Sequence, residues 1–422
     1  MRRISRPAAL AVVALALSIL LAPVALTVTA QPARADSLRA REYWLDDYGI
    51  RSAWSTTEGQ GVTVAVIDTG VDGSVPELRG VVTGGTDFSG KGGADGQTPI
   101  DDDSSHGTLV GSLIAGRGTG PTSGMIGVAP KAHLLSISVG FGSSAVDPDG
   151  QIAKAVVWAV DHGAKVINMS LTRNTLDWPT SWDRAFLYAM KHGVVVVAAA
   201  GNRGSGTDEV GAPATMPGVL TVAGVDQAKN ASFDASSQGI TIGVAAPSEG
   251  LVGVAPGGGY LLWSGTSGAT PIVAGIAALV IAAHPGISAD DVIQRIVSTA
   301  TPKGTPSPGP IYGHGLVDAQ KAVTADVAHV TSNPLGDLSG WIRLHRRAEA
   351  TPQATSKPVP TTPVTATPTT ATAAGTDDGI LPSAEGIRSV GIPVTVYSLF
   401  GVIFLAVVIG AARHLRRIRA RR

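Results

Sequence analysis

The sequence of 422 residues contains no cysteine. Disulfide bonds, thiolate zinc sites, iron–sulfur clusters and a cysteine nucleophile are therefore excluded. Charged residues are also scarce, at 15% of the chain, and aromatic residues make up only 5%. Apolar residues, by contrast, reach 44%. That share is enough for a large folded core and too high for a wholly disordered chain.

The formal net charge of zero hides a strong separation of charge along the chain. Ten arginines lie in residues 1–35 and 413–422, where there is no acidic residue. The 22 basic residues in between face 32 acidic ones, so this middle part carries a net charge of about −10. Such a balance disfavours a general nucleic-acid binder, and we expect no nucleic-acid partner.

Both ends of the chain have the features of targeting segments. Residues 1–35 begin with arginines, continue as an apolar run from Ala8 to Leu26 and end in Ala33-Arg34-Ala35, which predicts a secretory signal peptide. An uncleaved N-terminal anchor is the alternative. Residues 392–412 are 21 uncharged, mainly apolar residues, enough at about 1.5 Å per residue to cross a bilayer core. The basic tail at 413–422 then favours a cytoplasmic C-terminus and an extracytoplasmic middle, in a single-pass protein of the cell membrane.

Residues 348–379 are rich in Thr, Pro and Ala. They have too little apolar surface to offset the entropy of an ordered chain, which predicts an extended stalk. The predicted layout is a signal peptide (1–35), an N-terminal segment packing on the main domain (36–60), the main domain (61–325), an extension with the stalk (326–391), a transmembrane helix (392–412) and a basic cytoplasmic tail (413–422).

Within the main domain, short apolar runs alternate with amphipathic helical stretches. The runs contain many β-branched residues and are apolar on both faces, as expected of buried parallel strands. They span residues 62–67, 134–139, 166–169, 194–199 and 219–225, and the helical stretches span residues 150–162, 180–192 and 288–300. This alternation predicts an α/β fold with a mainly parallel sheet covered by helices.

Three polar residues become informative in combination. Asp68 follows the first apolar run, His106 precedes an apolar helical stretch, and Ser267 lies between small residues at the start of another. Taken singly, each favours a structural role in a turn or at a helix end. Together they supply a nucleophile, a base and a carboxylate that fixes the tautomer of the base. Their chain order, Asp-His-Ser, is that of subtilisin and differs from that of chymotrypsin.

The sequence resembles the subtilisin-like serine proteases, or subtilases, over residues 45–325. The resemblance rests on VAVIDTGVD (64–72), HGTLVGSLIAG (106–116) and SGTSGATPIVAG (264–275). It implies the subtilisin-like three-layer α/β fold and a serine endopeptidase that cleaves peptide bonds through an acyl-enzyme.

The same resemblance assigns roles to four residues. It implies Ser267 as the nucleophile, His106 as the general base and then general acid, and Asp68 as the carboxylate that orients His106. It further implies that Asn202 donates to the oxyanion together with the backbone N–H of Ser267. No cofactor and no catalytic metal are implied. Structural calcium, which is common in the family, is left open by acidic loops such as residues 147–149.

The resemblance also indicates where a substrate would bind. Residues 166–171 resemble the substrate-binding edge strand of the family, which pairs with an extended peptide. We therefore expect substrate contacts from Ser170, Leu171 and Thr172. The acidic run at 101–103 favours either a solvated loop or an acidic wall, including Asp103, that selects basic substrates.

Two positions depart from the pattern of the family. Thr172 stands where many subtilases have glycine, and we expect it to narrow the primary specificity pocket or alter strand pairing. Gly268 stands directly after Ser267, where the family often has a bulky residue. We expect this glycine to enlarge the space beside Ser267.

Residues 36–61 are too few for the usual folded propeptide of the family. With the predicted C-terminal membrane helix, the chain resembles the mycosins, the membrane-anchored subtilases of type VII secretion systems. This implies a protein or peptide substrate and a secretion membrane complex as partner, with an N-terminal segment that wraps the catalytic domain. Two alternatives stay open: a mainly structural partner of such a complex with secondary proteolysis, and a general degradative subtilase.

Overall fold

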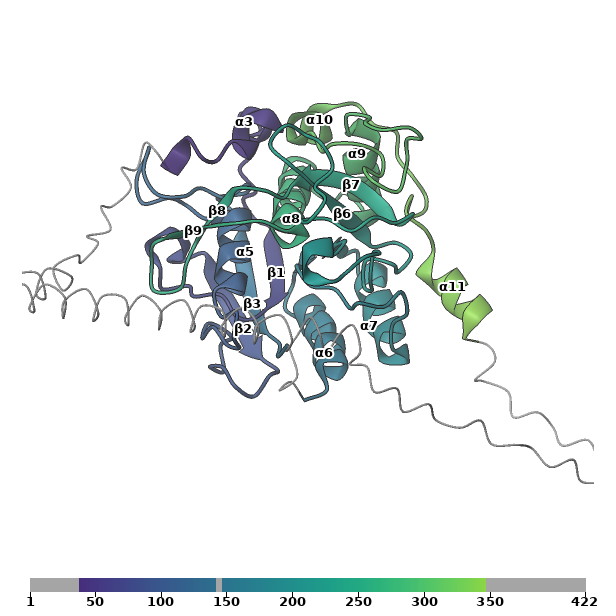
Figure 1. Cartoon of the computed structure of the whole chain (residues 1–422), viewed down its shortest axis with the longest axis horizontal. Coiled ribbons are helices and arrows are strands. Elements are labelled where there is room, and N and C mark those ends of the chain that lie inside the picture. Colours follow the sequence, from purple (N-terminus) through teal and green to yellow (C-terminus); the bar gives the residue numbers. More distant parts are fainter. Residues whose placement is uncertain (1–37, 142–145, 347–422) are drawn as a thin grey trace, which may run out of the picture. The chain divides into compact units, whose positions relative to one another are not determined.

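The computed structural model describes residues 38–141 and 146–346 (Figure 1). The predicted signal peptide (1–35), stalk (348–379), transmembrane helix (392–412) and basic tail (413–422) lie outside the described residues. Those four segments stay predictions from the sequence.

A seven-stranded sheet runs through the centre of the described fold (Figure 1). In spatial order its strands are β2 (Val82–Asp87), β3 (His133–Ser138), β1 (Thr63–Asp68), β4 (Val166–Met169), β5 (Val195–Ala199), β6 (Leu220–Val225) and β7 (Ile242–Pro247). Every pairing between them is parallel. The carboxyl ends of neighbouring strands therefore lie at the same edge of the sheet, with Asp68 of β1 in register with Ser138 of β3.

Four long helices pack against this sheet in two pairs. The pairs are α5 (His106–Ala115) with α8 (Thr266–Ala283), and α6 (Pro148–Asp161) with α7 (Thr180–Lys191). Helices α5 and α6 both contact β1 and β3, which are almost entirely buried strands. A strand that is buried on both faces needs a helix layer on each side. The pairs are therefore the outer layers, and the three-layer α/β fold predicted from the sequence is confirmed.

The remaining elements lie outside these two pairs and the sheet. They are α3 (Trp44–Asp47), α4 (Ile50–Ala53), α9 (Ala289–Thr299), α10 (Ala319–Thr324), α11 (Leu338–His345), the 3₁₀ turns η2 (Pro76–Leu78) and η3 (Arg203–Ser205), and an antiparallel hairpin of β8 (Leu251–Val254) and β9 (Tyr260–Trp263). The hairpin lies between β7 and α8 in the chain, so β9 leads directly into the helix that carries Ser267.

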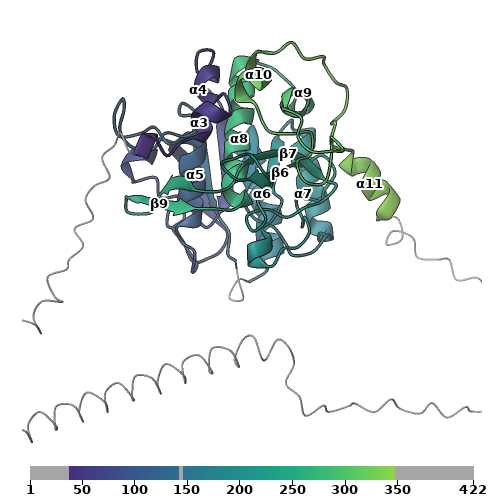
Figure 2. The same ribbon diagram turned by 45° about the horizontal axis from the view of Figure 1, so that its top comes forward.

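The N-terminal segment forms part of the hydrophobic core. Trp44, Leu45 and Ile50 are fully buried. Helix α4 lies beside α10, and α10 in turn contacts α8 (Figure 2). The indole N–H of Trp54 donates to the carbonyl O of Val128 at 2.8 Å. Removing this segment would therefore expose apolar surface of the main domain.

The described part of the C-terminal extension ends in α11. This helix contacts α7 and places Trp341 against Trp178, with ring centroids 4.3 Å apart. The Arg346 guanidinium forms an ion pair with Asp183 at 2.9 Å. The extension thus stays in contact with the main domain up to residue 346.

Helix α8 is the one helix in the described ranges that is long and apolar enough to cross a membrane. Its most apolar stretch is 78% buried inside the fold. It contacts strands from β4 to β7 and helices α5, α9 and α10, so it is the central helix of the core.

Five of the seven strands of the sheet were predicted from their apolar runs, each to within one residue at either end. The sequence did not indicate β2 or β7. Strand β2 is an edge strand with the sequence VTGGTD and has no apolar run. The helix predicted at 288–300 is present as α9, and the Ser288 side chain caps its start by accepting the backbone N–H of Asp291 at 3.1 Å.

Candidate active site

Asp68 is the last residue of β1, and its side chain is buried. Its Oδ1 atom accepts hydrogen bonds from the backbone N–H of Thr69, at 2.8 Å, and from Nδ1 of His106, at 2.7 Å. A carboxylate only accepts hydrogen bonds, so the ring proton of His106 resides on Nδ1 and Nε2 keeps its lone pair. In this tautomer the imidazole is able to take a proton from a neighbouring group.

Helix α5 begins at His106, and its start lies against the turn that follows Asp68. The backbone N–H of Gly107 donates to Thr69 Oγ1 at 3.1 Å. A Cβ atom at position 107 would overlap the carbonyl O of Gly70. Only glycine therefore allows this close approach, which brings the imidazole within hydrogen-bonding distance of Asp68.

The surroundings of His106 alter its proton affinity in two directions. Burial acts to lower the pKa of the imidazole, but the charge and hydrogen bond of Asp68 and the charge of Asp103 raise that pKa above its ordinary value. His106 is therefore neutral, and able to act as a base, only above this raised pKa.

Ser267 is the second residue of α8. Its Oγ donates to the carbonyl O of Ser170 at 3.1 Å, and Ser170 Oγ donates to the carbonyl O of Ser267 at 2.8 Å. These reciprocal bonds tie the start of α8 to the residue after β4. In the described structure Ser267 and His106 are not hydrogen-bonded to each other.

Asn202 follows β5 and is held by the residue before Ser267. Its Oδ1 accepts hydrogen bonds from the backbone N–H of Thr266, at 2.8 Å, and from Thr266 Oγ1, at 2.9 Å. The Nδ2 group makes no hydrogen bond to any described residue, and a Cβ atom at Gly265 would lie 3.1 Å from it. The amide is thus fixed by its oxygen and keeps its N–H groups available next to the start of α8.

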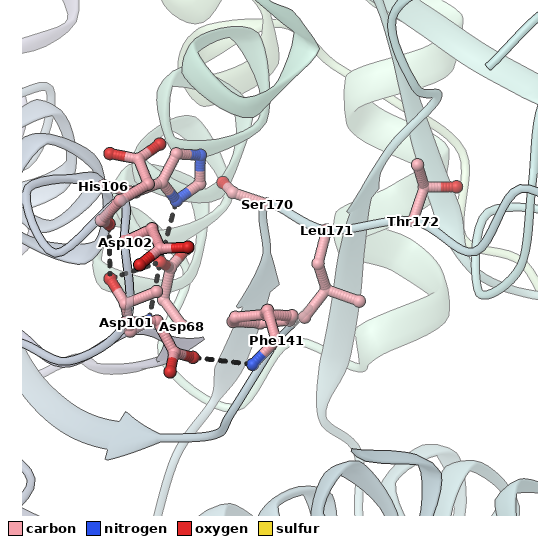
Figure 3. A pocket seen from close by; sticks show the side chains of 10 residues that line it. Asp68, Asp101, Asp102, His106, Phe141, Ser170, Leu171 and Thr172 are labelled. Atoms are coloured by element: carbon pink, nitrogen blue, oxygen red, sulfur yellow. Dashed lines mark hydrogen bonds and ion pairs between the residues drawn. The ribbon is translucent and has the colours of Figure 1, made fainter. Parts of the chain in front are cut away.

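A hollow of about 390 Å³ opens beside His106 (Figure 3). Besides Asp68 and His106, it is lined by Thr69, Asp101, Asp102, Asp103, Phe141, Ser170, Leu171 and Thr172. The acidic side chains gather on the side of His106, whereas Phe141 and Leu171 lie together on the other side (Figure 3). All predicted substrate-binding residues, Asp103 included, therefore line one hollow.

The acidic run at 101–103 has two parts with different partners. The Asp101 carboxylate pairs with Lys91 at 2.6 Å and accepts the backbone N–H of Phe141 at 2.7 Å. Asp102 and Asp103 are exposed, and Asp103 accepts Ser105 Oγ at 3.0 Å. The negative charge at the mouth of the hollow thus comes mainly from Asp102 and Asp103.

Two expectations from the sequence are corrected here. Strand β4 has no free edge, because it is the central strand of the sheet, between β1 and β5. Only residues 170–172, which follow β4, are placed at the hollow. The space beside Ser267 at Gly268 is also not open, since a Cβ atom there would overlap Leu251 Cδ1 and lie 3.4 Å from the Trp263 ring.

Sequence reasoning missed Phe141 and Trp263. Phe141 comes shortly after β3, so its place at the carboxyl edge of the sheet could have indicated it. Trp263 contacts His106 edge to face, with ring centroids 5.8 Å apart and an interplanar angle of 77°. No pattern in the sequence indicates that contact, because it depends on how the hairpin of β8 and β9 folds back.

A metal site is not found in the part of the chain that the structure describes, where no three His, Asp or Glu side chains form a ligand cluster. In the acidic loop at 147–149, Asp147 caps α6 by accepting the backbone N–H of Gly150 at 3.0 Å. Asp149 forms an ion pair with Arg173 at 2.6 Å.

Comparison with known proteins identifies relatives of the chain. Residues 59–315 match the Subtilase family. Subtilisin of Bacillus pumilus is 39% identical over 267 residues, covering 63% of this chain and 91% of that protein. The structure of MycP3 protease from the type VII (ESX-3) secretion system aligns with a TM-score of 0.59 at 33% identity, covering 67% of this chain and 88% of the other. MycP1 from Mycobacterium smegmatis aligns with a TM-score of 0.58 at 30% identity, covering 70% and 86%.

The family match spans more than half of the chain and includes Asp68, His106, Asn202 and Ser267. Subtilisins and MycP proteases are among the relatives that align well in sequence and in structure. The resemblance inferred from the three motifs is therefore confirmed, and the chain belongs to the subtilase family as a subtilisin-like serine endopeptidase.

Proposed function

We propose that the chain cleaves peptide bonds with Asp68, His106 and Ser267 as its catalytic triad. The observation that carries this assignment is the 2.7 Å bond from His106 Nδ1 to Asp68, which leaves Nε2 as a proton acceptor. Ser267 exchanges its bond to the Ser170 carbonyl for one to Nε2. Its Oγ then attacks the carbonyl carbon of the substrate while Nε2 takes the hydroxyl proton.

The attack gives a tetrahedral intermediate whose oxyanion needs hydrogen-bond donors. The free Nδ2 group of Asn202 and the backbone N–H of Ser267, which is in the first turn of α8, supply them. When the intermediate collapses, the C–N bond breaks and His106 gives its proton to the leaving amine. Water then enters, is deprotonated by His106 and releases the acyl group from Ser267.

The hollow beside His106 is the proposed binding site for the residues on the acyl side of the cut. Residues 170–172 leave the sheet after β4 and line the hollow, where their backbone N–H and C=O groups would pair with an extended peptide. Phe141 and Leu171 supply apolar contact, while Asp102 and Asp103 favour a basic side chain.

A fluorophosphonate probe tests the proposed chemistry, because it reacts only with an activated serine. We expect the full-length chain to be labelled and the Ser267→Ala and His106→Ala variants not to be. Leu176→Ala, at an exposed position outside the hollow, is the matched control and should be labelled like wild type. Absence of labelling in a folded wild-type chain contradicts the proposal.

We also propose that the enzyme is anchored in the cell membrane by residues 392–412, with its catalytic domain outside the cytoplasm, and that it acts with a type VII secretion complex. The support is the apolar run followed by a basic tail, and the similarity to MycP3, a protease from such a system. A chain ending at residue 391 should move from the membrane fraction to the soluble fraction.

A secretion assay distinguishes a catalytic role of the chain from a purely structural one. In a strain that lacks the chain, wild type should restore secretion and Ser267→Ala should not, although both reach the membrane in equal amounts. Full restoration by Ser267→Ala would instead favour the role of a structural partner. Normal secretion without the chain would favour a general degradative protease.

A further inference from the structure

The aromatic ring of Trp263 stands nearly at right angles to the imidazole of His106. The ring centroids are 5.8 Å apart and the planes meet at 77°, the edge-to-face arrangement that aromatic rings prefer. Trp263 also precedes Ser267 by four residues, at the end of β9. One side chain therefore contacts the proposed base and is joined by a short stretch of backbone to the proposed nucleophile.

Two glycines form the slot that holds the indole. A Cβ atom at Gly253 of β8 would lie 3.1 Å from Trp263 Nε1, and one at Gly268 of α8 would lie 3.4 Å from Cζ2 and Cη2 on the same side of the ring. The indole N–H is buried and has no acceptor among the described residues. Since no hydrogen bond holds the ring, its position is set by the shape of the slot.

The hairpin that carries Trp263 is fixed to the elements that carry Asp68 and His106. The backbone N–H of Val254 donates to Ser112 Oγ of α5 at 3.0 Å, and that of Gly257 donates to Asp72 Oδ2 at 2.8 Å. The Tyr260 hydroxyl is hydrogen-bonded to Glu77. The ring of Trp263 is therefore held in a fixed position relative to α5 and to the turn after β1.

From these contacts we infer that Trp263 is a positioning residue, which holds the imidazole of His106 in the orientation that the reaction with Ser267 requires. The Asp68 hydrogen bond fixes one atom of the imidazole but leaves the ring free to tilt about that bond. The indole blocks this tilt from the side of β9. The inference rests on the proposed triad and adds a fourth residue to its geometry.

The inference predicts a change in the titration of His106 as well as in rate. Asp68 on β1 and Asp103 on the loop before α5 face His106, and Asp101 and Asp102 line the same hollow. Removing the indole leaves these charges in place but exposes the ring to water. Because burial lowers the pKa of His106, exposure raises it, and the acid limb of the activity profile moves to higher pH.

The test compares Trp263→Ala and Trp263→Phe with wild type in the full-length chain. Leu262→Ala is the matched control, since Leu262 is the preceding residue of β9 and is 58% exposed. Two quantities are measured: the rate of labelling by the fluorophosphonate probe against pH, and the titration of the His106 ring protons by NMR of histidine-labelled protein. Circular dichroism checks that each variant folds.

We expect Trp263→Ala to lower the labelling rate about 10- to 100-fold, as expected for a misplaced base. Its acid limb and its His106 titration should both move to higher pH. Trp263→Phe should restore most of the rate, because phenylalanine keeps an aromatic edge against His106 and buries no N–H group. Leu262→Ala should behave as wild type. For peptide substrates, the loss in Trp263→Ala should lie mainly in kcat.

The labelling rate also distinguishes positioning of His106 from contact with the substrate. The probe has no peptide residues on the side of its leaving group, so Trp263 has no substrate residue to contact there. An unchanged labelling rate with a raised KM for peptides would overturn the inference in favour of substrate contact. An unchanged His106 titration in Trp263→Ala would overturn it as well. If wild type itself is not labelled, the proposed function fails, and the His106 titration still decides whether Trp263 sets the environment of that ring.

Discussion

The N-terminal segment offers a quantitative test of how far the folded domain extends, because the family match begins only at residue 59. Leu45 precedes that point and is fully buried in the main core. Leu45→Ala removes three carbon atoms, at about 0.8 kcal/mol for each buried methylene, which gives about 2.4 kcal/mol. The cavity left behind adds to this, so we expect a total loss of about 3–5 kcal/mol in the free energy of unfolding.

Urea unfolding followed by tryptophan fluorescence measures this loss. All seven tryptophans lie between residues 44 and 341, so the signal reports the described domain and not the ends of the chain. Each variant is made in a Ser267→Ala background, which prevents self-cleavage during unfolding. Leu176→Ala is the matched control, because Leu176 is 55% exposed and its truncation should change stability by less than about 0.5 kcal/mol.

A loss below about 1 kcal/mol for Leu45→Ala, similar to that of Leu176→Ala, would refute the reasoning. It would mean that the domain is stable without its first helices and that the segment is an attachment. A loss in the expected range would place α3 and α4 within the cooperative unit. Cleavage between this segment and the rest of the chain would then destabilise the enzyme.

Three further predictions concern the proposed site. Asp103→Asn removes a charge that raises the pKa of His106, so the acid limb of kcat/KM should move to lower pH; a limb that stays in place contradicts the contribution of Asp103. Asn202→Ala should lower kcat about 10²- to 10³-fold with little change in KM. A raised KM with an unchanged kcat would contradict its role toward the oxyanion. Replacing Asp102 and Asp103 together by Asn, while keeping Asp101 with its structural bonds, should reduce cleavage of basic peptides more than that of matched neutral peptides. Equal losses of kcat/KM for both peptides would contradict the proposal that the acidic wall selects basic substrates.

The strands predicted from the sequence share one property, which is burial on both faces. Such strands read as continuous apolar runs, so β1 and β4 were predictable to within a residue. Strand β2 lies at the edge of the sheet and contains Gly84 and Gly85 in place of apolar residues. A Cβ atom at Gly85 would overlap the carbonyl O of Asp95. Glycine is required at this position because a side chain would not fit, and a hydrophobicity pattern does not reveal such a requirement.

The predicted site residues come together because the sheet is parallel. Asp68 ends a strand, Ser170 and Asn202 each follow one, and the carboxyl ends of parallel strands share one edge. That rule allowed the sequence to indicate the place of the site and the residues around it. It did not indicate that β4 is a central strand and not an edge strand, because the order of strands in a sheet does not follow from their order along the chain.

The contacts that sequence reasoning missed are those made across elements by shape. Gly107 and Gly268 both appear in the recognisable motifs, yet a motif does not say which group approaches each glycine. In the structure, Gly107 admits the carbonyl of Gly70 and so brings His106 to Asp68, whereas Gly268 admits the side chain of Leu251 and lies in contact with the ring of Trp263. The first approach acts on the imidazole through its hydrogen bond to Asp68, and Trp263, which packs beside Gly268, contacts the same ring in an edge-to-face arrangement. The small residues of the motifs thus set the geometry of His106 as much as the polar residues supply its chemistry.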